Sequence, residues 1–173
     1  MGVNMSDLKL LLTAFRGSSA EQLIKYANKF DTLNLPNDKV KDSENLISIM
    51  SSGKYHYVFS FGQRPNIKNK VHIETTAMNG EDYIKTKFDC EQLYELFQAN
   101  GITAKISHNA GTSFCNCLYY NGLAYIQKKQ LQTKMVFLHI PFLKNIDDTE
   151  LFFIKLINIV EKIGRYNDNV NFR

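Results

Sequence analysis

Two cysteines stand one residue apart in the segment GTSFCNC, residues 111–117, of a chain that has one other cysteine. Cys115 follows a short loop and opens a predicted helix, and the partial positive charge of a helix N-terminus favours a thiolate. Cys117 lies about 200° further round the same helix, so the two thiols cannot both point into one site. The spacing favours Cys115 as a candidate nucleophile, and a small buried side chain is the alternative.

A catalytic thiol also needs a group that takes up a proton and later returns it to the leaving amine, which is a task for histidine. Among four histidines, His139 stands out because it lies in VFLHIPF, a segment that is otherwise apolar. A polar residue there is either bonded within the core or used in chemistry. A third group, usually a carboxylate, orients the imidazole, and Glu74 on a predicted strand is one of several candidates.

Composition limits the remaining classes of function. The formal charge is +4, but the lysines are scattered among acidic and amide residues, which is typical of a solvated face. Most of the 12 Phe and 9 Tyr lie inside apolar runs, so we expect no nucleic-acid binding. Three cysteines give neither a disulfide framework nor the usual zinc spacing, so we expect no metal, no cofactor and a cytoplasmic location.

The length of 173 residues predicts one domain. We place it at residues 7–166, between tails at 1–6 and 167–173. The longest apolar stretch, residues 151–160, is too short to span a bilayer, so we expect no membrane association.

Apolar segments of strand length alternate with helical patterns along the chain. Ser18 and Glu21 have capping-box spacing before a first helix, and Asp147 and Glu150 are expected to cap the last one. In residues 69–80, Val71 and Ile73 alternate with His72 and Glu74, which predicts one strand with a polar face. Strands are expected at 8–15, 30–36, 55–62, 69–80, 102–108 and 134–142. Helices are expected at 16–30, 42–53, 90–101 and 111–130, and a final amphipathic helix is expected after Asp147.

This order predicts a single-domain three-layer α/β/α sandwich with a largely parallel, mixed sheet. Ligand-binding and catalytic residues in such folds lie at the carboxyl ends of the strands, where Cys115 is expected to lie.

The segments SHNAGTSFCNCLYYNGL and VFLHIPFL resemble the pyroglutamyl peptidase I family of cysteine peptidases. That family carries an Ala-Gly-x-x-x-Cys-Asn segment and, later, a His-hydrophobic-Pro segment. Its third motif, a Gly-Gln before a strand with an acidic residue and an Ala-x-Asn, resembles FGQRPNIKNKVHIETTAMNG. The resemblance covers most of the chain, from KLLLTAF at residues 9–15 to the last helix, and three separate motifs agree.

The resemblance implies a Cys-His-Glu triad, with Cys115 as nucleophile, His139 as general base and acid, and Glu74 orienting the ring. It implies removal of an N-terminal pyroglutamyl group from a peptide with a blocked N-terminus, and homo-oligomers in many members. On this match the substrate-binding residues are Phe15, Gln63, Ser113 and Phe114.

The sequence departs from the family pattern after the first strand, where AFRGSSA keeps Phe15 but lacks a proline and a second phenylalanine of the lactam pocket. The stretch between Glu74 and Cys115 is also short, and no arginine follows Glu74. One rival hypothesis is a related thiol hydrolase that acts on another small N-acyl or lactam substrate. Another is a non-catalytic binding domain of the same fold.

Overall fold

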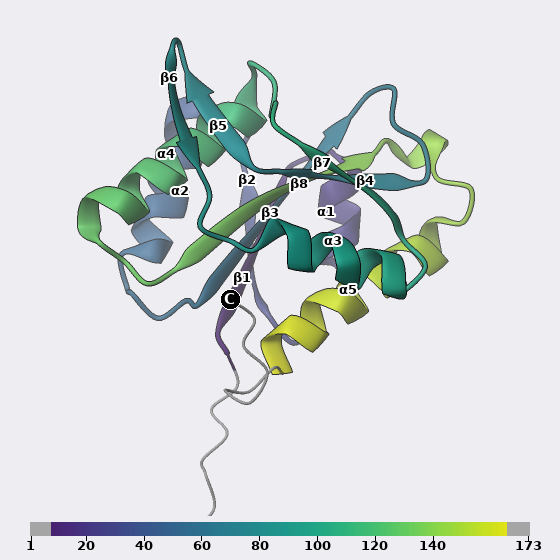
Figure 1. Cartoon of the computed structure of the whole chain (residues 1–173). Helices are drawn as coiled ribbons and strands as arrows, with labels where there is room; N and C mark the ends of the chain where they lie inside the picture. Colours follow the sequence, from purple (N-terminus) through teal and green to yellow (C-terminus); the bar gives the residue numbers. More distant parts are fainter. Residues whose placement is uncertain (1–7, 166–173) are drawn as a thin grey trace, which may run out of the picture.

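A six-stranded sheet in the order β2-β1-β3-β8-β4-β7 forms the centre of the computed structural model, which describes residues 8–165 (Figure 1). Neighbouring strands are parallel except β4 and β8, which pair antiparallel, so the predicted mixed and largely parallel sheet is confirmed. The strands of this sheet are β1 (Leu10–Phe15), β2 (Asp31–Leu35), β3 (Tyr57–Arg64), β4 (Lys70–Glu74), β7 (Thr103–Ser107) and β8 (Lys134–Pro141).

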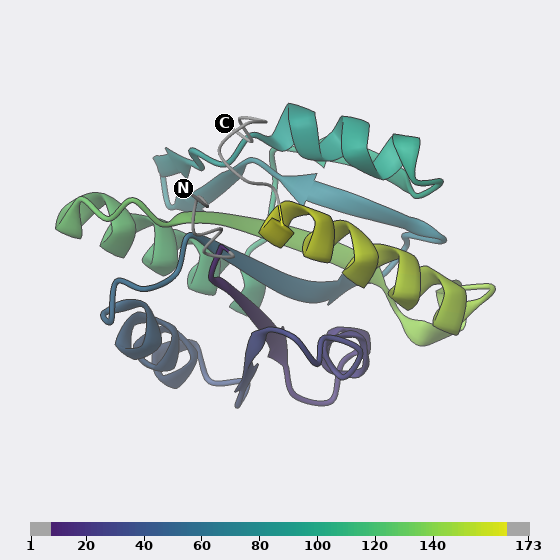
Figure 2. The same cartoon turned by 90° about the horizontal axis from the view of Figure 1, so that it is seen from below.

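Helices cover both faces of the sheet, as the three-layer prediction requires. Side chains of α1 (Ser19–Ile24), α3 (Cys90–Ala99) and α5 (Thr149–Arg165) pack in one core layer. Those of α2 (Lys39–Met50) and α4 (Phe114–Lys129) pack in the other. Figure 2 shows α5 on the near side of the sheet and α4 on its far side. A hairpin of β5 (Thr76–Asn79) and β6 (Asp82–Lys85) lies beside α4, and a short 3₁₀ helix, η1 (Leu143–Asn145), follows β8.

Strand β8 shows why the chain folds in this way. Its side chains alternate between the two faces, and both faces are buried. Val136, Leu138 and Ile140 enter the layer of α1, α3 and α5, whereas Met135 and Phe137 enter the layer of α2 and α4. His139 continues the second series, so its imidazole shares a face of the sheet with α4.

Three details of the sequence prediction are wrong. The segment 69–80 is two strands, because the chain leaves the main sheet at Thr75 and continues as β5 in the hairpin. The supposed polar face of the first part is buried, since His72 is 9% and Glu74 0% exposed. The cap of α5 is Asp148 and not the predicted Asp147, because Asp148 accepts a hydrogen bond from the backbone of Leu151 at 3.0 Å, whereas the Asp147 carboxylate accepts from Asn69. The predicted tails at 1–6 and 167–173 lie outside the described residues.

Candidate active site

Strand register brings the predicted site residues to one edge of the sheet. His139 on β8 is paired with Gly62 on β3, near the carboxyl ends of both parallel strands. Glu74 is the last residue of β4 and pairs with Phe137 across the antiparallel ladder. Paired residues in a ladder, and residues two apart on a strand, share a face. Glu74, Phe137 and His139 therefore project from the same face of the sheet.

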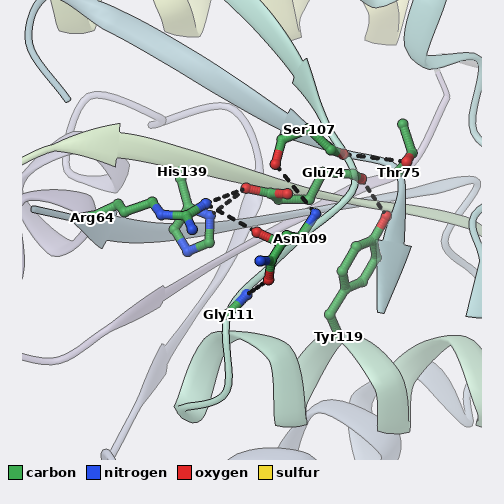
Figure 3. A network of polar contacts seen from close by, with 8 residues as sticks. All are labelled: Arg64, Glu74, Thr75, Ser107, Asn109, Gly111, Tyr119 and His139. Atoms are coloured by element: carbon green, nitrogen blue, oxygen red, sulfur yellow. Dashed lines mark hydrogen bonds and ion pairs between the residues drawn. The ribbon is translucent and has the colours of Figure 1, made fainter. Parts of the chain in front are cut away.

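Glu74 and His139 form a buried hydrogen-bonded pair. Nδ1 of His139 lies 2.8 Å from Oε1 of Glu74, and the two residues are 3% and 0% exposed. A carboxylate only accepts hydrogen bonds, so Nδ1 carries a proton, and in the neutral ring Nε2 then keeps its lone pair. This is the tautomer that a general base needs. Figure 3 shows the imidazole and the Glu74 carboxylate facing each other.

Arg64, the last residue of β3, also reaches this carboxylate. Its Nη1 lies 3.2 Å from Oε1 of Glu74 and donates to the backbone carbonyl of Asn109 at 3.0 Å (Figure 3). It thus ties Glu74 to the loop that leads into α4. The sequence analysis did not select Arg64, although it directly follows Gln63 in the quoted motif.

Two further residues fix the surroundings of Glu74. The hydroxyl of Tyr119, buried on α4, donates to the backbone carbonyl of Glu74 at 2.8 Å (Figure 3). Asn116 exchanges two hydrogen bonds with the backbone of Met78 on β5, at 2.8 and 2.9 Å. Tyr119 lies four residues after Cys115, so helical spacing alone could have found it.

Cys115 is in the first turn of α4, and its sulfur lies over the backbone of β3. A methyl group placed on Gly62 would lie 2.6 Å from Sγ of Cys115 and 2.8 Å from Cζ of Phe137. The ring of Phe137 has its centroid 5.0 Å from that of the His139 imidazole. Gly62 and Phe137 are thus neighbours of both the thiol and the imidazole, and the three predicted triad residues gather at one place.

The thiol of Cys115 does not have the lowered pKa that the sequence analysis expected. Burial raises its pKa to about 12, and the nearby charge of Glu74 acts in the same direction. Its own backbone amide and the charge of Arg64 lower the pKa but do not outweigh burial. Desolvation therefore exceeds the effect of the helix N-terminus, and the thiol of the free chain is protonated at neutral pH.

This protonation state predicts the pH dependence of alkylation. Below a thiol pKa of about 12, the thiolate fraction grows roughly tenfold per pH unit. We therefore expect the rate of Cys115 labelling by iodoacetamide to rise roughly tenfold per pH unit from about pH 7 to about pH 9. Peptide mapping of the labelled protein measures this rate. A rate that is constant over this range would contradict the prediction, because it would reveal a thiolate already paired with an imidazolium.

The four predicted substrate-binding residues differ in their surroundings. Phe15 at the end of β1 and Phe114 at the start of α4 have ring centroids 6.5 Å apart, and Phe114 is 39% exposed. Ser113 is the N-cap of α4, but its hydroxyl makes no capping hydrogen bond. The side-chain oxygen of Gln63 accepts from the backbone N–H of Ser19 at 2.9 Å, which holds the start of α1 against β3.

Within residues 8–165, no group of three or more His, Cys, Asp or Glu side chains is arranged to hold a metal ion. In the same part of the chain, no helix is long and apolar enough to cross a membrane.

Comparisons with known proteins find similarity to pyroglutamyl peptidases. The family model described as pyroglutamyl peptidase matches residues 83–152, which include Cys115 and His139. The pyrrolidone-carboxylate peptidase of Fusobacterium nucleatum is 29% identical over 138 residues, covering 67% of this chain and 64% of the relative. Pyrrolidone-carboxylate peptidase 2 of Caldanaerobacter subterraneus is 43% identical over 108 residues, covering 50% and 52%. The chain thus spans about half to two thirds of the length of these curated relatives.

The fold is also found in a solved structure, the pyrrolidone carboxyl peptidase of Fervidobacterium islandicum. The two superpose with a TM-score of 0.81 over 90% of this chain and 98% of the other, at 21% identity. At this identity the likeness shows the fold, and it confirms the α/β architecture.

Proposed function

We propose that this chain, which belongs to the pyroglutamyl peptidase family, is a cysteine peptidase that removes N-terminal pyroglutamyl groups from peptides. One observation carries the proposal: a buried carboxylate–imidazole pair, 2.8 Å long, on the face of the sheet over which the Cys115 sulfur lies. The pair supplies an oriented base, and the sulfur supplies a nucleophile within the same small volume.

The protonated thiol determines the order of events. As Sγ of Cys115 attacks the carbonyl carbon of the pyroglutamyl residue, its proton passes to Nε2 of His139. The charge of Glu74 stabilises the imidazolium that forms. His139 then returns the proton to the leaving amine, which departs as the shortened peptide. Water, activated by the same imidazole, hydrolyses the thioester, and pyroglutamate and the free thiol result.

The start of α4 is suited to hold the oxyanion. The first backbone N–H groups of a helix have no acceptor inside the helix. Cys115 is the second residue of α4, so its own N–H is one of these donors and lies beside the nucleophile. The mechanism therefore needs no metal ion or cofactor.

The free thiol also bears on location. The three cysteines are free, and a reducing compartment keeps a thiol nucleophile active. The proposal therefore includes a cytoplasmic site of action.

The test is hydrolysis of a fluorogenic pyroglutamyl amide under reducing conditions, beside prolyl and N-acetyl amides. The lactam ring offers few atoms for recognition, and Phe15 and Phe114 are its expected apolar walls. This chain lacks the second phenylalanine of the family's lactam pocket, and the loss of one such wall costs about 1 to 3 kcal/mol of binding free energy. We therefore expect turnover that is detectable and depends on the thiol, but has a high KM. Equal rates on all three amides would instead favour the related hydrolase with another small substrate. If the folded protein hydrolysed none of the three amides, the hypothesis of a non-catalytic binding domain would be favoured.

A further inference from the structure

His72 is a buried histidine for which the proposed reaction has no task. It lies in the middle of β4, directly opposite His139 in the antiparallel ladder between β4 and β8. It is 9% exposed, and among the described residues neither of its ring nitrogens has a hydrogen-bond partner.

A second unpaired group lies two residues away. Glu74 uses Oε1 for both His139 and Arg64, whereas its Oε2 is buried and has no partner among the described residues. Residues two apart on a strand present their side chains on the same face, with a rise of about 7 Å between them. An imidazole and a glutamate side chain together can span that separation. A single hydrogen bond between them would satisfy two of the three buried atoms.

The charges around His72 agree with a close approach to Glu74. Burial lowers the pKa of His72, and the largest opposing effect is the negative charge of Glu74. The positive charges of Arg64 on β3, Lys70 on β4 and Lys105 on β7 act in the same direction as burial. His72 is therefore neutral at physiological pH, with one ring nitrogen as a donor.

We propose that His72 is a positioning residue that donates a ring N–H to Oε2 of Glu74 while His139 donates to Oε1. The role deepens the proposed function and rests on it, because His72 would act on the reaction only through Glu74 and His139. A carboxylate held at both oxygens cannot rotate away from the general base. Packing alone gives no reason for this residue, since phenylalanine would fill the same space without buried nitrogens.

The proposal has a consequence for pH dependence. A carboxylate that accepts from His72 as well as from Arg64 and His139 attracts an imidazolium less strongly than one that accepts from Arg64 and His139 alone. Without His72, Glu74 would hold the protonated form of His139 more tightly. The base would then become available only at higher pH, so the acid limb of the profile of kcat/KM against pH would move upward, by about half a pH unit.

The experiment compares His72→Phe with His72→Gln, which keeps a donor. His56→Phe is the matched control, because it makes the same substitution at an exposed histidine that accepts from the backbone of Lys9. Two measurements are made on each variant. One is the downfield Nδ1–H proton resonance of His139, which requires no turnover, and the other is the profile of kcat/KM on the pyroglutamyl amide.

We expect His72→Phe to move the His139 resonance and to shift the acid limb upward, while His72→Gln lies nearer to wild type and His56→Phe matches it. If His72→Phe leaves both the resonance and the profile unchanged, His72 is a packing residue and the proposal is overturned. A moved resonance in a chain that hydrolyses no pyroglutamyl amide would instead support the contact and refute the proposed substrate. Should His72→Phe not fold, an unmoved resonance in His72→Ala would overturn the contact in the same way.

Discussion

Replacing Cys115 with alanine is expected to remove hydrolysis of the pyroglutamyl amide, with a fall in kcat of about 10⁴-fold or more. In the proposed reaction the sulfur makes the covalent bond to the substrate, a role that neither His139 nor Glu74 has in it. Cys117→Ala is the matched control, since this thiol lies two residues on and points elsewhere on α4. Its activity should stay within about twofold of wild type. If Cys117→Ala were the inactive variant, the nucleophile would be misassigned.

Replacing His139 with alanine should be about as damaging. The thiol is protonated in the free chain because burial raises its pKa to about 12, so attack depends on a base that removes the proton. When residues act as one catalytic unit, the losses of kcat from single substitutions do not add. The double variant Cys115→Ala/His139→Ala should therefore have about the same kcat as either single variant. His108 is the control, because its Nδ1 lies 2.7 Å from the Thr75 hydroxyl and not beside the Glu74 carboxylate that His139 contacts. Normal rates in His139→Ala with loss in His108→Ala would show that the base is His108.

Much of the fold could be predicted from local patterns in the sequence. The run around His139 is apolar on both sides, which is typical of a central strand, and the structure has β8 there. Ser18 was expected to cap a helix, and its hydroxyl accepts from the backbone of Glu21. The break at Thr75 could not be predicted, because both halves of the segment have strand character. Pairing with β6 decides where the second half goes, and that contact lies outside any local window.

The residue types of the candidate site could be predicted from the sequence, but the Arg64–Glu74 contact and the pKa of the thiol could not. A histidine inside an apolar strand and a cysteine at a helix start are visible in the sequence, as is Glu74. Arg64 was missed because its contact with Glu74 joins two strands that are not neighbours in the sheet. The raised pKa of Cys115 was missed for a similar reason. A helix N-terminus can be seen in the sequence, but the burial of the sulfur, which raises its pKa, depends on tertiary packing.

Gly62 provides the most stringent test of how the sulfur is placed. It is paired with His139 across β3 and β8, and its face of the strand is occupied by the Cys115 sulfur and the Phe137 ring. A methyl group at Gly62 would lie 2.6 Å from Sγ and 2.8 Å from Cζ of Phe137, which is far inside van der Waals contact. The backbone of Gly62 has no positive φ, so alanine is disfavoured there by this contact and not by strain of the chain.

We therefore expect Gly62→Ala to fold, with a loss of about 1 to 3 kcal/mol in the free energy of unfolding from overpacking. The sulfur or the ring must move to admit the methyl group, and a displacement of about 1 Å at a reacting atom costs roughly 10²-fold in kcat/KM. Ser60→Ala is the control, because it also alters a buried position, about 7 Å along the same strand from Gly62, where the hydroxyl pairs with Thr13 and not with the sulfur. Thermal unfolding and steady-state kinetics on both variants separate the two effects. Wild-type kcat/KM in Gly62→Ala would mean that the sulfur does not need the place over Gly62 for catalysis, and the assignment of Cys115 as nucleophile would lose its geometric support.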